Sequence, residues 1–574
     1  MNKKLYFLIN WLVLISFPVL TVQAAEKTAI IRYDTLHQPV IGKNGMVVSQ
    51  RAVASQVGAD ILKNGGNAVD AAVAVGFALA VTLPRAGNLG GGGFMLVHLA
   101  KENKTIALDY REMAPAAAQR DMFLDSQGNV DEQKARFSLL SAGVPGTVSG
   151  LSYALENYGT MSLSQVIAPA IRLAEQGITV GYDLSEVMKQ RRHLRTASSC
   201  MIYFKVGCVP YEAGETLVQQ DLAWSLRQIQ KYGPNAFYKG EIALKIVQEM
   251  QQNGGLITLQ DLANYKVVER EPVRGSFKGY EVVSMPPPSS GGVHIIQMLN
   301  ILDHFPLKDF GPNSAASLHH YGEVMKRAYA DRSKYLGDPD HTDVPVKGLI
   351  SQAYAAEIAQ EIKACCITAS DDILPGAAPK YESPDTTHFS VMDKWGNAVS
   401  NTYTLNFSFG SGHSIPGTGI LMNNEMDDFS SKPGVPNAFG LLGAEANAIA
   451  ATKRPLSSMT PTIVFKDAKP YLVTGSPGGS RIITTVLQML VNVLVYDMNV
   501  AEASHMPRIH HQWYPDILFM EPGFSPDTVK ILKEMGYKTE ASGTMGSLQS
   551  IQWKDGLFWG ASDPRRPGAA AIAN

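Results

Sequence analysis

The order of apolar and polar residues along the chain predicts alternating helices and strands. Two apolar stretches, 52–62 and 67–81, have the length and spacing of helices, and the polar turn 64–66 separates them. The second stretch is so rich in alanine and valine that we expect it to be buried. Two short apolar segments, 94–99 and 105–110, then predict strands.

The middle of the chain, from about residue 160 to 375, has mostly helical patterns. Residues 163–176 form one predicted helix, whose start has the spacing of a capping box, and residues 242–253 form another. The segment 286–292, with three prolines and two glycines, interrupts the pattern, and we expect a helix to begin after it. Residues 370–385 are polar, contain proline and follow no pattern, which is typical of a linker.

After residue 385 the pattern changes to alternation. Residues 387–393 and 398–405 alternate on either side of a short turn, so they predict a β-hairpin, and residues 462–474 predict a second one. A long apolar helix is expected at 481–495. Strands covered by apolar helices indicate a layered α/β architecture.

The first 24 residues have the features of a secretory signal peptide. A basic start is followed by the apolar run 5–20 and by small residues up to Ala24, after which we expect cleavage. The alternative is an uncleaved membrane anchor, but the run is short for a membrane span and Pro18 interrupts it. With no later run of spanning length, we expect no stable membrane insertion and a periplasmic or extracellular location.

Composition excludes some partners. The 574 residues are 45% hydrophobic and carry a formal net charge of -2, so a core is easily built and no nucleic-acid partner is expected. The 13 histidines are dispersed, and the sequence contains no H-E-x-x-H zinc motif, Walker A loop or G-x-S-x-G elbow. We therefore expect neither a cofactor nor a metal.

The four cysteines leave two possibilities open. Cys200 and Cys208 can close a small loop in an oxidising compartment, while adjacent residues such as Cys365 and Cys366 rarely bond to each other. Alternatively, all four are scattered cysteines with no chemical role.

Thr386 is the first candidate for chemistry, because it stands where the linker meets the first strand of a new unit. Cleavage of the peptide bond before it would give Thr386 a free α-amine, and a terminal amine can serve as the base for a weak hydroxyl nucleophile. The alternative is an ordinary threonine chosen for β-propensity.

A glycine-rich turn gives a second candidate. Residues 475–481 end a strand and open the helix at 481–495, so Gly478 and Gly479 can present backbone N–H groups at a helix N-terminus. Such donors hold the oxyanion in acyl transfer, at about 3 kcal/mol each. The alternative is a turn that only allows close packing.

Seven segments together carry a resemblance to a known family. Read in chain order, the sequence resembles the γ-glutamyltranspeptidases over nearly all of its length beyond residue 24. The matching segments are Asn88–Met95, Asp109–Glu112, Asp385–Ser390, Thr404–Asn406, Asn423–Phe429, Arg454–Met459 and Gly475–Ser480.

The resemblance implies an N-terminal-nucleophile hydrolase, a four-layer αββα sandwich, that matures from a zymogen by cutting itself. The cut would fall between Asp385 and Thr386. It would give a large subunit, 25–385, and a small catalytic subunit, 386–574, which pair as a heterodimer.

The resemblance also implies the reaction. Thr386 would attack the γ-amide carbonyl of glutathione or a related donor, and water, an amino acid or a peptide would then accept the γ-glutamyl group. Thr404 matches the threonine that hydrogen-bonds the nucleophile, and Gly478 and Gly479 match the oxyanion donors.

For the donor's α-carboxylate, the resemblance implies binding by Arg111 with the hydroxyls of Ser457 and Ser458. Taken alone, Arg111 would be assigned to a surface ion pair with Asp109 or Glu112.

For the donor's α-ammonium, it implies binding by Asp428 with Asn406 and Glu425. Taken alone, Asp427 and Asp428 would be assigned to a solvated turn or a helix cap.

One position departs from the family pattern. Phe439 lies in the segment that matches the pocket lid of many bacterial members, which often have tyrosine there. The loss of the hydroxyl leaves the stability of the lid open, and with it the balance of hydrolysis against transfer.

Two other functions are weighed against this one. A glutaryl (cephalosporin) acylase shares the fold, but its donor lacks the ammonium that Asp428 would bind. A non-catalytic binding relative would not need Thr386, Thr404 and the two glycines together.

Overall fold

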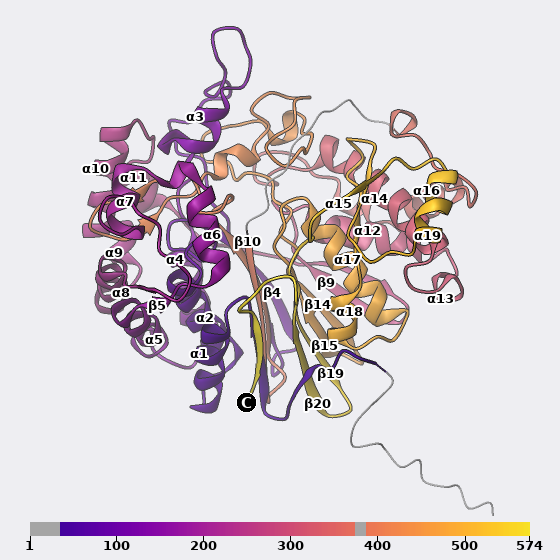
Figure 1. Cartoon of the computed structure of the whole chain (residues 1–574), viewed down its shortest axis with the longest axis horizontal. Coiled ribbons are helices and arrows are strands. Elements are labelled where there is room, and N and C mark those ends of the chain that lie inside the picture. Colours follow the sequence, from indigo (N-terminus) through magenta and orange to yellow (C-terminus); the bar gives the residue numbers. More distant parts are fainter. Residues whose placement is uncertain (1–34, 374–385) are drawn as a thin grey trace, which may run out of the picture. The chain divides into compact units, whose positions relative to one another are not determined.

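Two seven-stranded antiparallel sheets lie face to face in the unit His37–Asn574 of the computed structural model, which describes residues 35–373 and 386–574 (Figure 1). The strand order is β1-β20-β19-β15-β14-β9-β8 in one sheet and β21-β2-β10-β11-β3-β4-β7 in the other. The strands of the first sheet are β1 (Val40–Gly42), β8 (Val273–Phe277), β9 (Tyr280–Ser284), β14 (Thr462–Lys466), β15 (Lys469–Thr474), β19 (Gln549–Lys554) and β20 (Leu557–Ser562). Those of the second are β2 (Gly45–Ser49), β3 (Gly92–Leu99), β4 (Lys104–Tyr110), β7 (Val268–Arg270), β10 (Thr386–Asp393), β11 (Ala398–Thr404) and β21 (Ala570–Ala573).

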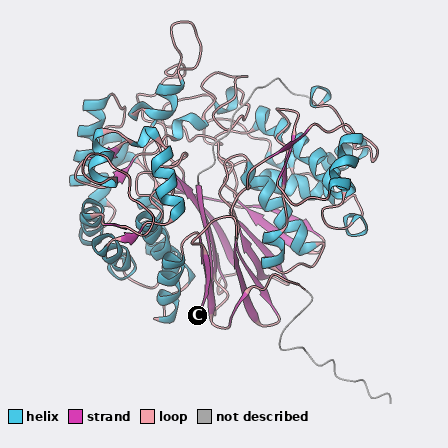
Figure 2. Cartoon of the chain, viewed as in Figure 1, coloured by secondary structure: helices cyan, strands magenta, loops and turns pink. Residues whose placement is uncertain are grey.

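Helices cover the outer face of each sheet, so the predicted four-layer αββα sandwich is confirmed (Figure 2). The helices on the side of β10 and β11 are α1 (Ala52–Lys63), α2 (Ala68–Thr82), α4 (Thr147–Tyr158), α5 (Leu163–Gln176) and α8 (Gln220–Tyr232). Those on the side of β8 and β9 are α12 (Gly291–Leu302), α14 (Ala315–Tyr335), α16 (Gln352–Glu361), α17 (Arg481–Leu494) and α18 (Val500–His505). Every residue of α2 is buried, because this helix packs on β10 and β11 on one side and on α1, α4 and α5 on the others.

The two predicted hairpins form as expected. β10 pairs with β11 so that Thr386 lies opposite Thr404. β14 pairs with β15 through a tight turn at Asp467 and Ala468, whose φ angles of 51° and 58° are those of a type I′ turn. Both hairpins lie in the interior layers, which explains their apolar sequences.

Two predicted boundaries are wrong. The segment 370–385 does not begin as a linker, because Ser370 is buried and its hydroxyl donates to the backbone oxygen of Trp513 at 2.7 Å. The helix expected after residue 292 begins at Gly291, inside the glycine pair, because the chain folds tightly against Met285 and Thr460 there and leaves no room for a side chain.

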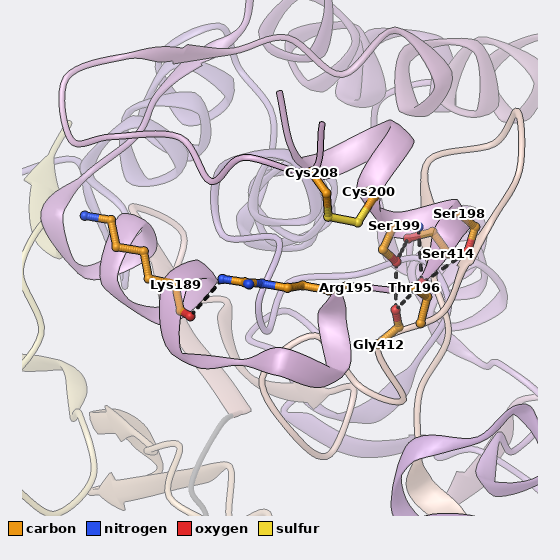
Figure 3. The surroundings of a disulfide bond; sticks show 9 residues. All are labelled: Lys189, Arg195, Thr196, Ser198, Ser199, Cys200, Cys208, Gly412 and Ser414. Atoms are coloured by element: carbon orange, nitrogen blue, oxygen red, sulfur yellow. Dashed lines mark hydrogen bonds between the residues drawn. A yellow bond between two sulfur atoms is a disulfide. The ribbon is translucent and has the colours of Figure 1, made fainter. Parts of the chain in front are cut away.

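A disulfide joins Cys200 to Cys208, the first of the two possibilities that the sequence left open (Figure 3). Cys200 lies in α7 (Ala197–Tyr203), which also contacts a distant part of the chain. The hydroxyls of Thr196 and Ser199 donate to the backbone oxygen of Gly412 at 3.1 and 2.7 Å. The start of the helix that carries Cys200 therefore packs on the segment that follows β11.

The structure also pairs Cys365 with Cys366, which the sequence analysis did not expect. The two residues lie in the turn after α16. Whether the side chains of two consecutive cysteines meet depends on the backbone conformation of this turn, which the spacing of the cysteines along the sequence does not reveal.

Within residues 35–373 and 386–574, no helix combines the length and the apolar character that a membrane span needs.

Candidate active site

A small pocket opens where β10 begins and β11 ends. The other walls come from a short helical turn at Glu425–Asp428, the loop at 454–459, the start of α17 and one residue of α14. The lining residues are Arg111, Arg332, Thr386, Thr404, Asn406, Glu425, Asp428, Phe439, Leu441, Ser457, Ser458, Met459, Gly479, Ser480 and Ile482. The pocket thus brings together all the site residues predicted from the sequence except Gly478, which precedes Gly479 in the chain, and Asp385, which lies outside the described residues.

Thr386 is the first residue of β10 and is nearly buried. Its hydroxyl lies 3.3 Å from that of Thr404, its partner across the hairpin. Thr404 in turn accepts a hydrogen bond from the backbone N–H of Asn406 at 2.8 Å. Asn406 has a φ angle of 76°, which turns the chain out of the strand and along the pocket wall. Strand pairing therefore fixes the position of the Thr386 hydroxyl.

The glycine turn lies on the opposite wall. Gly478 and Gly479 have φ angles of 138° and 55°, in the left-handed region that favours glycine, and α17 begins two residues later. The ring of Phe439 lies over Gly479 so closely that a Cβ atom on Gly479 would come within 2.6 Å of it. The lid segment is therefore seated on the glycine turn.

Arg111 is fully buried and forms the centre of a charged cluster. Its guanidinium pairs with Glu425, with Asp428 at 2.5 Å and with Glu112 at 3.5 Å. The ion pair with Glu112 that the sequence allowed does form, but in the interior. Asp109 is not a side-chain partner of Arg111 and pairs with Arg454 at 2.7 Å instead.

Burial shifts the protonation of this cluster. Burial raises the pKa of Glu112 to about 7, against the opposing effect of Arg111. Burial also raises the pKa of Glu425 well above its usual value, and the nearby carboxylates of Glu112 and Asp428 add to the shift. The pKa of Arg111 is raised despite burial because Glu425 and Asp428 stabilise its charge. The site is therefore one cation surrounded by carboxyl groups that compete for it.

Asp427 is not a solvated turn residue, which corrects that alternative. It is buried beside Arg136, and burial raises its pKa to about 7. Asp428 is also largely buried and faces the pocket.

Ser457 and Ser458 lie on the pocket wall together with a residue that the sequence analysis missed. Arg332 of α14 is buried, and its Nη2 atom donates to the hydroxyl oxygen of Ser458 at 3.2 Å. A single arginine in a helix gives no sequence signal of this kind, because only the packing of α14 against the loop at 454–459 brings the two residues together.

The pocket brings together two threonine hydroxyls, a glycine turn and a cluster of charged side chains. Within the part of the chain that the structure describes, no group of three or more His, Cys, Asp or Glu side chains is arranged to hold a metal ion. The groups present suit acyl transfer through a covalent ester.

Comparison with known proteins gives the same picture. The family model for gamma-glutamyltranspeptidase matches residues 54–573. A glutathione hydrolase proenzyme from Escherichia coli (strain K12) is 57% identical over 539 residues, which span 93% of this chain and 92% of that relative.

Two solved structures are similar. The cephalosporin acylase from Bacillus halodurans has a TM-score of 0.82 at 28% identity, with 95% of this chain and 98% of that chain covered. The gamma-glutamyltranspeptidase from Helicobacter pylori has a TM-score of 0.57 at 46% identity, with 60% of this chain and 97% of that chain covered. With a family model that matches most of its length and a relative of this identity, the chain belongs to the gamma-glutamyltranspeptidase family.

Proposed function

We propose that this protein is a glutathione hydrolase and γ-glutamyltransferase that matures by cutting itself. One observation carries the proposal: the Thr386 hydroxyl shares a small pocket with a buried arginine and with carboxyl groups. A γ-glutamyl group has a carbonyl to be attacked, an α-carboxylate and an α-ammonium, so it matches this set group for group. The 57% identity to a glutathione hydrolase proenzyme supports the same assignment.

Maturation would cleave the bond between Asp385 and Thr386. Water is consumed, a carboxylate is left on Asp385 and an amine on Thr386. The products would be a large subunit, 25–385, and a small subunit, 386–574, held together as a heterodimer. The burial of Thr386 at the start of β10, with its hydroxyl facing the pocket, supports this cut.

Catalysis would then use Thr386 as both nucleophile and base. Its hydroxyl oxygen attacks the γ-carbonyl carbon while its α-amine takes the hydroxyl proton. The N–H groups of Gly478 and Gly479 stabilise the oxyanion, and the leaving amine takes the proton as the amide bond breaks. Water or an acceptor amine cleaves the resulting ester and restores the hydroxyl. The hydrogen bond to Thr404 holds the nucleophile in place.

Donor binding would exchange ion pairs in the pocket. In the structure, Arg111 pairs with Glu425 and Asp428. The donor's carboxylate would bind Arg111, Ser457 and Ser458, and its ammonium would bind Asp428, Glu425 and Asn406. The buried Oε2 atom of Glu425 accepts no hydrogen bond from any described residue, and an ammonium would supply one.

The lid would shield the ester from water. Phe439 is buried against Phe407, with 5.9 Å between ring centroids, and its backbone N–H donates to the side-chain oxygen of Asn437 at 3.0 Å. The ring covers the glycine turn by packing alone, without a tyrosine hydroxyl.

A second candidate function is a glutaryl acylase, favoured by the similarity to the cephalosporin acylase fold. A glutaryl group has a carboxylate for Arg111 but no ammonium, and it would leave Glu425 and Asp428 without a new partner. The acidic wall therefore favours γ-glutamyl donors. A non-catalytic relative would have no use for the Thr386–Thr404 pair at the end of a polar pocket.

For location, we propose export through a signal peptide cut after Ala24, to the periplasm or the exterior. The acceptor would be water, an amino acid or a peptide.

The test is p-nitroaniline release by purified, processed protein from γ-glutamyl-p-nitroanilide and glutaryl-p-nitroanilide. A strong preference for the γ-glutamyl donor is expected. A glutaryl preference would assign the protein to the acylases, and no release from either would contradict both enzyme assignments.

A further inference from the structure

Arg332 is a pocket cation that forms no direct ion pair with a described carboxylate, although the charge of Asp428 acts on it at longer range. It is 4% exposed, and its Nε atom donates to the hydroxyl oxygen of Ser290 at 2.9 Å while Nη2 donates to that of Ser458 at 3.2 Å. Among residues 35–373 and 386–574, no Asp or Glu pairs with it, whereas Arg111 has three acidic partners. Burial lowers the pKa of Arg332 to about 10, so the side chain is still a cation at neutral pH.

The chemistry of arginine fixes the direction of the hydrogen bond between Arg332 and Ser458. A guanidinium only donates hydrogen bonds, so Ser458 must accept from Arg332. Its own hydroxyl proton is then available, and no described residue accepts it. The hydroxyl of Ser457 is also a hydrogen-bond acceptor within the protein, because its oxygen accepts a hydrogen bond from the backbone N–H of Met459 at 3.1 Å. Two hydroxyls that accept from the protein and have a proton to donate suit an anion.

Ser290 connects Arg332 to the loop that carries Ser457 and Ser458. It lies in the breaker segment 286–292, and its hydroxyl donates to the backbone oxygen of Ser457 at 2.8 Å while accepting from Arg332. Its backbone N–H donates to the same oxygen at 2.8 Å. Arg332 thus links α14, the breaker segment and the serine loop, which come from both sides of the proposed cleavage site.

We propose that Arg332 is a positioning and specificity-determining residue for the carboxylate end of the donor. It holds Ser458 as a hydrogen-bond donor and supplies the positive potential that remains when Arg111 is neutralised by its acidic partners. The proposal rests on the γ-glutamyl function argued above.

Three donors separate the contributions of the two donor charges. γ-Glutamyl-p-nitroanilide has both charges, glutaryl-p-nitroanilide lacks the ammonium, and 4-aminobutyryl-p-nitroanilide lacks the carboxylate. In Arg332→Gln, we expect kcat/KM to fall roughly 10- to 100-fold for the two carboxylate donors, mainly through KM, because a charge-assisted contact is lost. The 4-aminobutyryl donor should change little. Arg332→Lys should recover part of the loss, since it restores the charge without the two-point geometry.

The matched control is Arg327→Gln. Arg327 lies on the same helix, is as buried as Arg332 and pairs with Glu323 at 2.8 Å away from the pocket. We expect this variant to lose stability but to keep the wild-type order of the three donors. All rates are taken per mole of processed small subunit.

A second variant covers the case in which Arg332→Gln does not mature. Ser290→Ala removes one of the two anchors of Arg332 and should produce a smaller loss with the same donor dependence. Inhibition constants for L-glutamate, which has the α-carboxylate, and for 4-aminobutyrate, which lacks it, give the same comparison without turnover.

Equal losses for all three donors, in either variant, would show that Arg332 is only structural and would overturn the proposal. A wild-type enzyme that does not favour the γ-glutamyl donor would instead contradict the proposed function.

Discussion

Replacing Gly479 by alanine should damage the site through the lid as well as through the backbone. The new Cβ atom would lie 2.6 Å from the ring of Phe439, and ordinary contact begins at 3.4 Å, so the ring must move by about 0.8 Å. The lid cannot follow freely, because Asn437 and Gln512 hold the backbone of Phe439 on both sides of the ring.

The magnitude has two parts. Alanine at a φ angle of 55° costs about 1 kcal/mol in backbone strain, and overpacking against the ring costs about 1–3 kcal/mol more. The matched control is Gly479→Ala in a Phe439→Ala background, which keeps the backbone strain and removes the ring contact. Gly479→Ala should therefore lower kcat/KM roughly tenfold further in the wild-type chain than in that background.

The assay is steady-state p-nitroaniline release from γ-glutamyl-p-nitroanilide by processed enzyme, with and without a dipeptide acceptor. A displaced lid should also raise the share of hydrolysis over transfer. The decisive comparison uses Phe439→Ala, which removes the ring that the new Cβ atom at position 479 would contact. If the extra loss from Gly479→Ala is just as large in that background, the lid contact is not its cause and the reasoning fails.

Three further outcomes are expected. Thr386→Ala should leave one uncut chain after signal removal, and two bands on a denaturing gel would remove Thr386 from the role of nucleophile. Asp428→Asn should weaken γ-glutamyl donors more than glutaryl donors, since only the former have an ammonium, and equal losses in kcat/KM would contradict that role. Asp563 is buried, which by itself raises its pKa, but Arg508 and Arg565 lower the pKa below its usual value. The ion pairs therefore stabilise the fold above about pH 4, and that stability is lost as the pH falls further. Asp563→Asn should be less stable at pH 7 by roughly 3–5 kcal/mol because the buried Arg508 loses its partner. Its melting temperature should then fall less between about pH 4 and pH 2 than that of the wild type, and parallel curves would refute this assignment.

The ion pairs that Arg111 makes in the pocket have a functional consequence. Arg111 already pairs with the carboxyl groups proposed to bind the donor's ammonium. A zwitterionic donor can therefore enter by exchanging partners, without leaving any buried charge alone, whereas a donor with one charge leaves part of the cluster unpaired. This offers a physical reason for selectivity that does not depend on the shape of the pocket.

The sequence by itself determined several long helices, two β-hairpins and the position of Thr386 at the start of a strand. The apolar character of α2 and the alternation in β10 and β11 are local properties, and local periodicity is enough to predict them. The position of Thr386 at the start of a strand, after a polar segment, was readable in the same way. The motif order then led to the family.

Only the tertiary structure decided which charges meet. Arg111 and Asp428 are 317 positions apart in the chain, and their pairing follows from the packing of the helical turn Glu425–Asp428 against the end of β4. Arg332 and the anchoring of Ser370 left no trace in the sequence, because each depends on polar contacts between distant segments. Burial is likewise a property of the assembled layers, so the raised pKa values of Glu112 and Glu425 could not be predicted from composition or spacing.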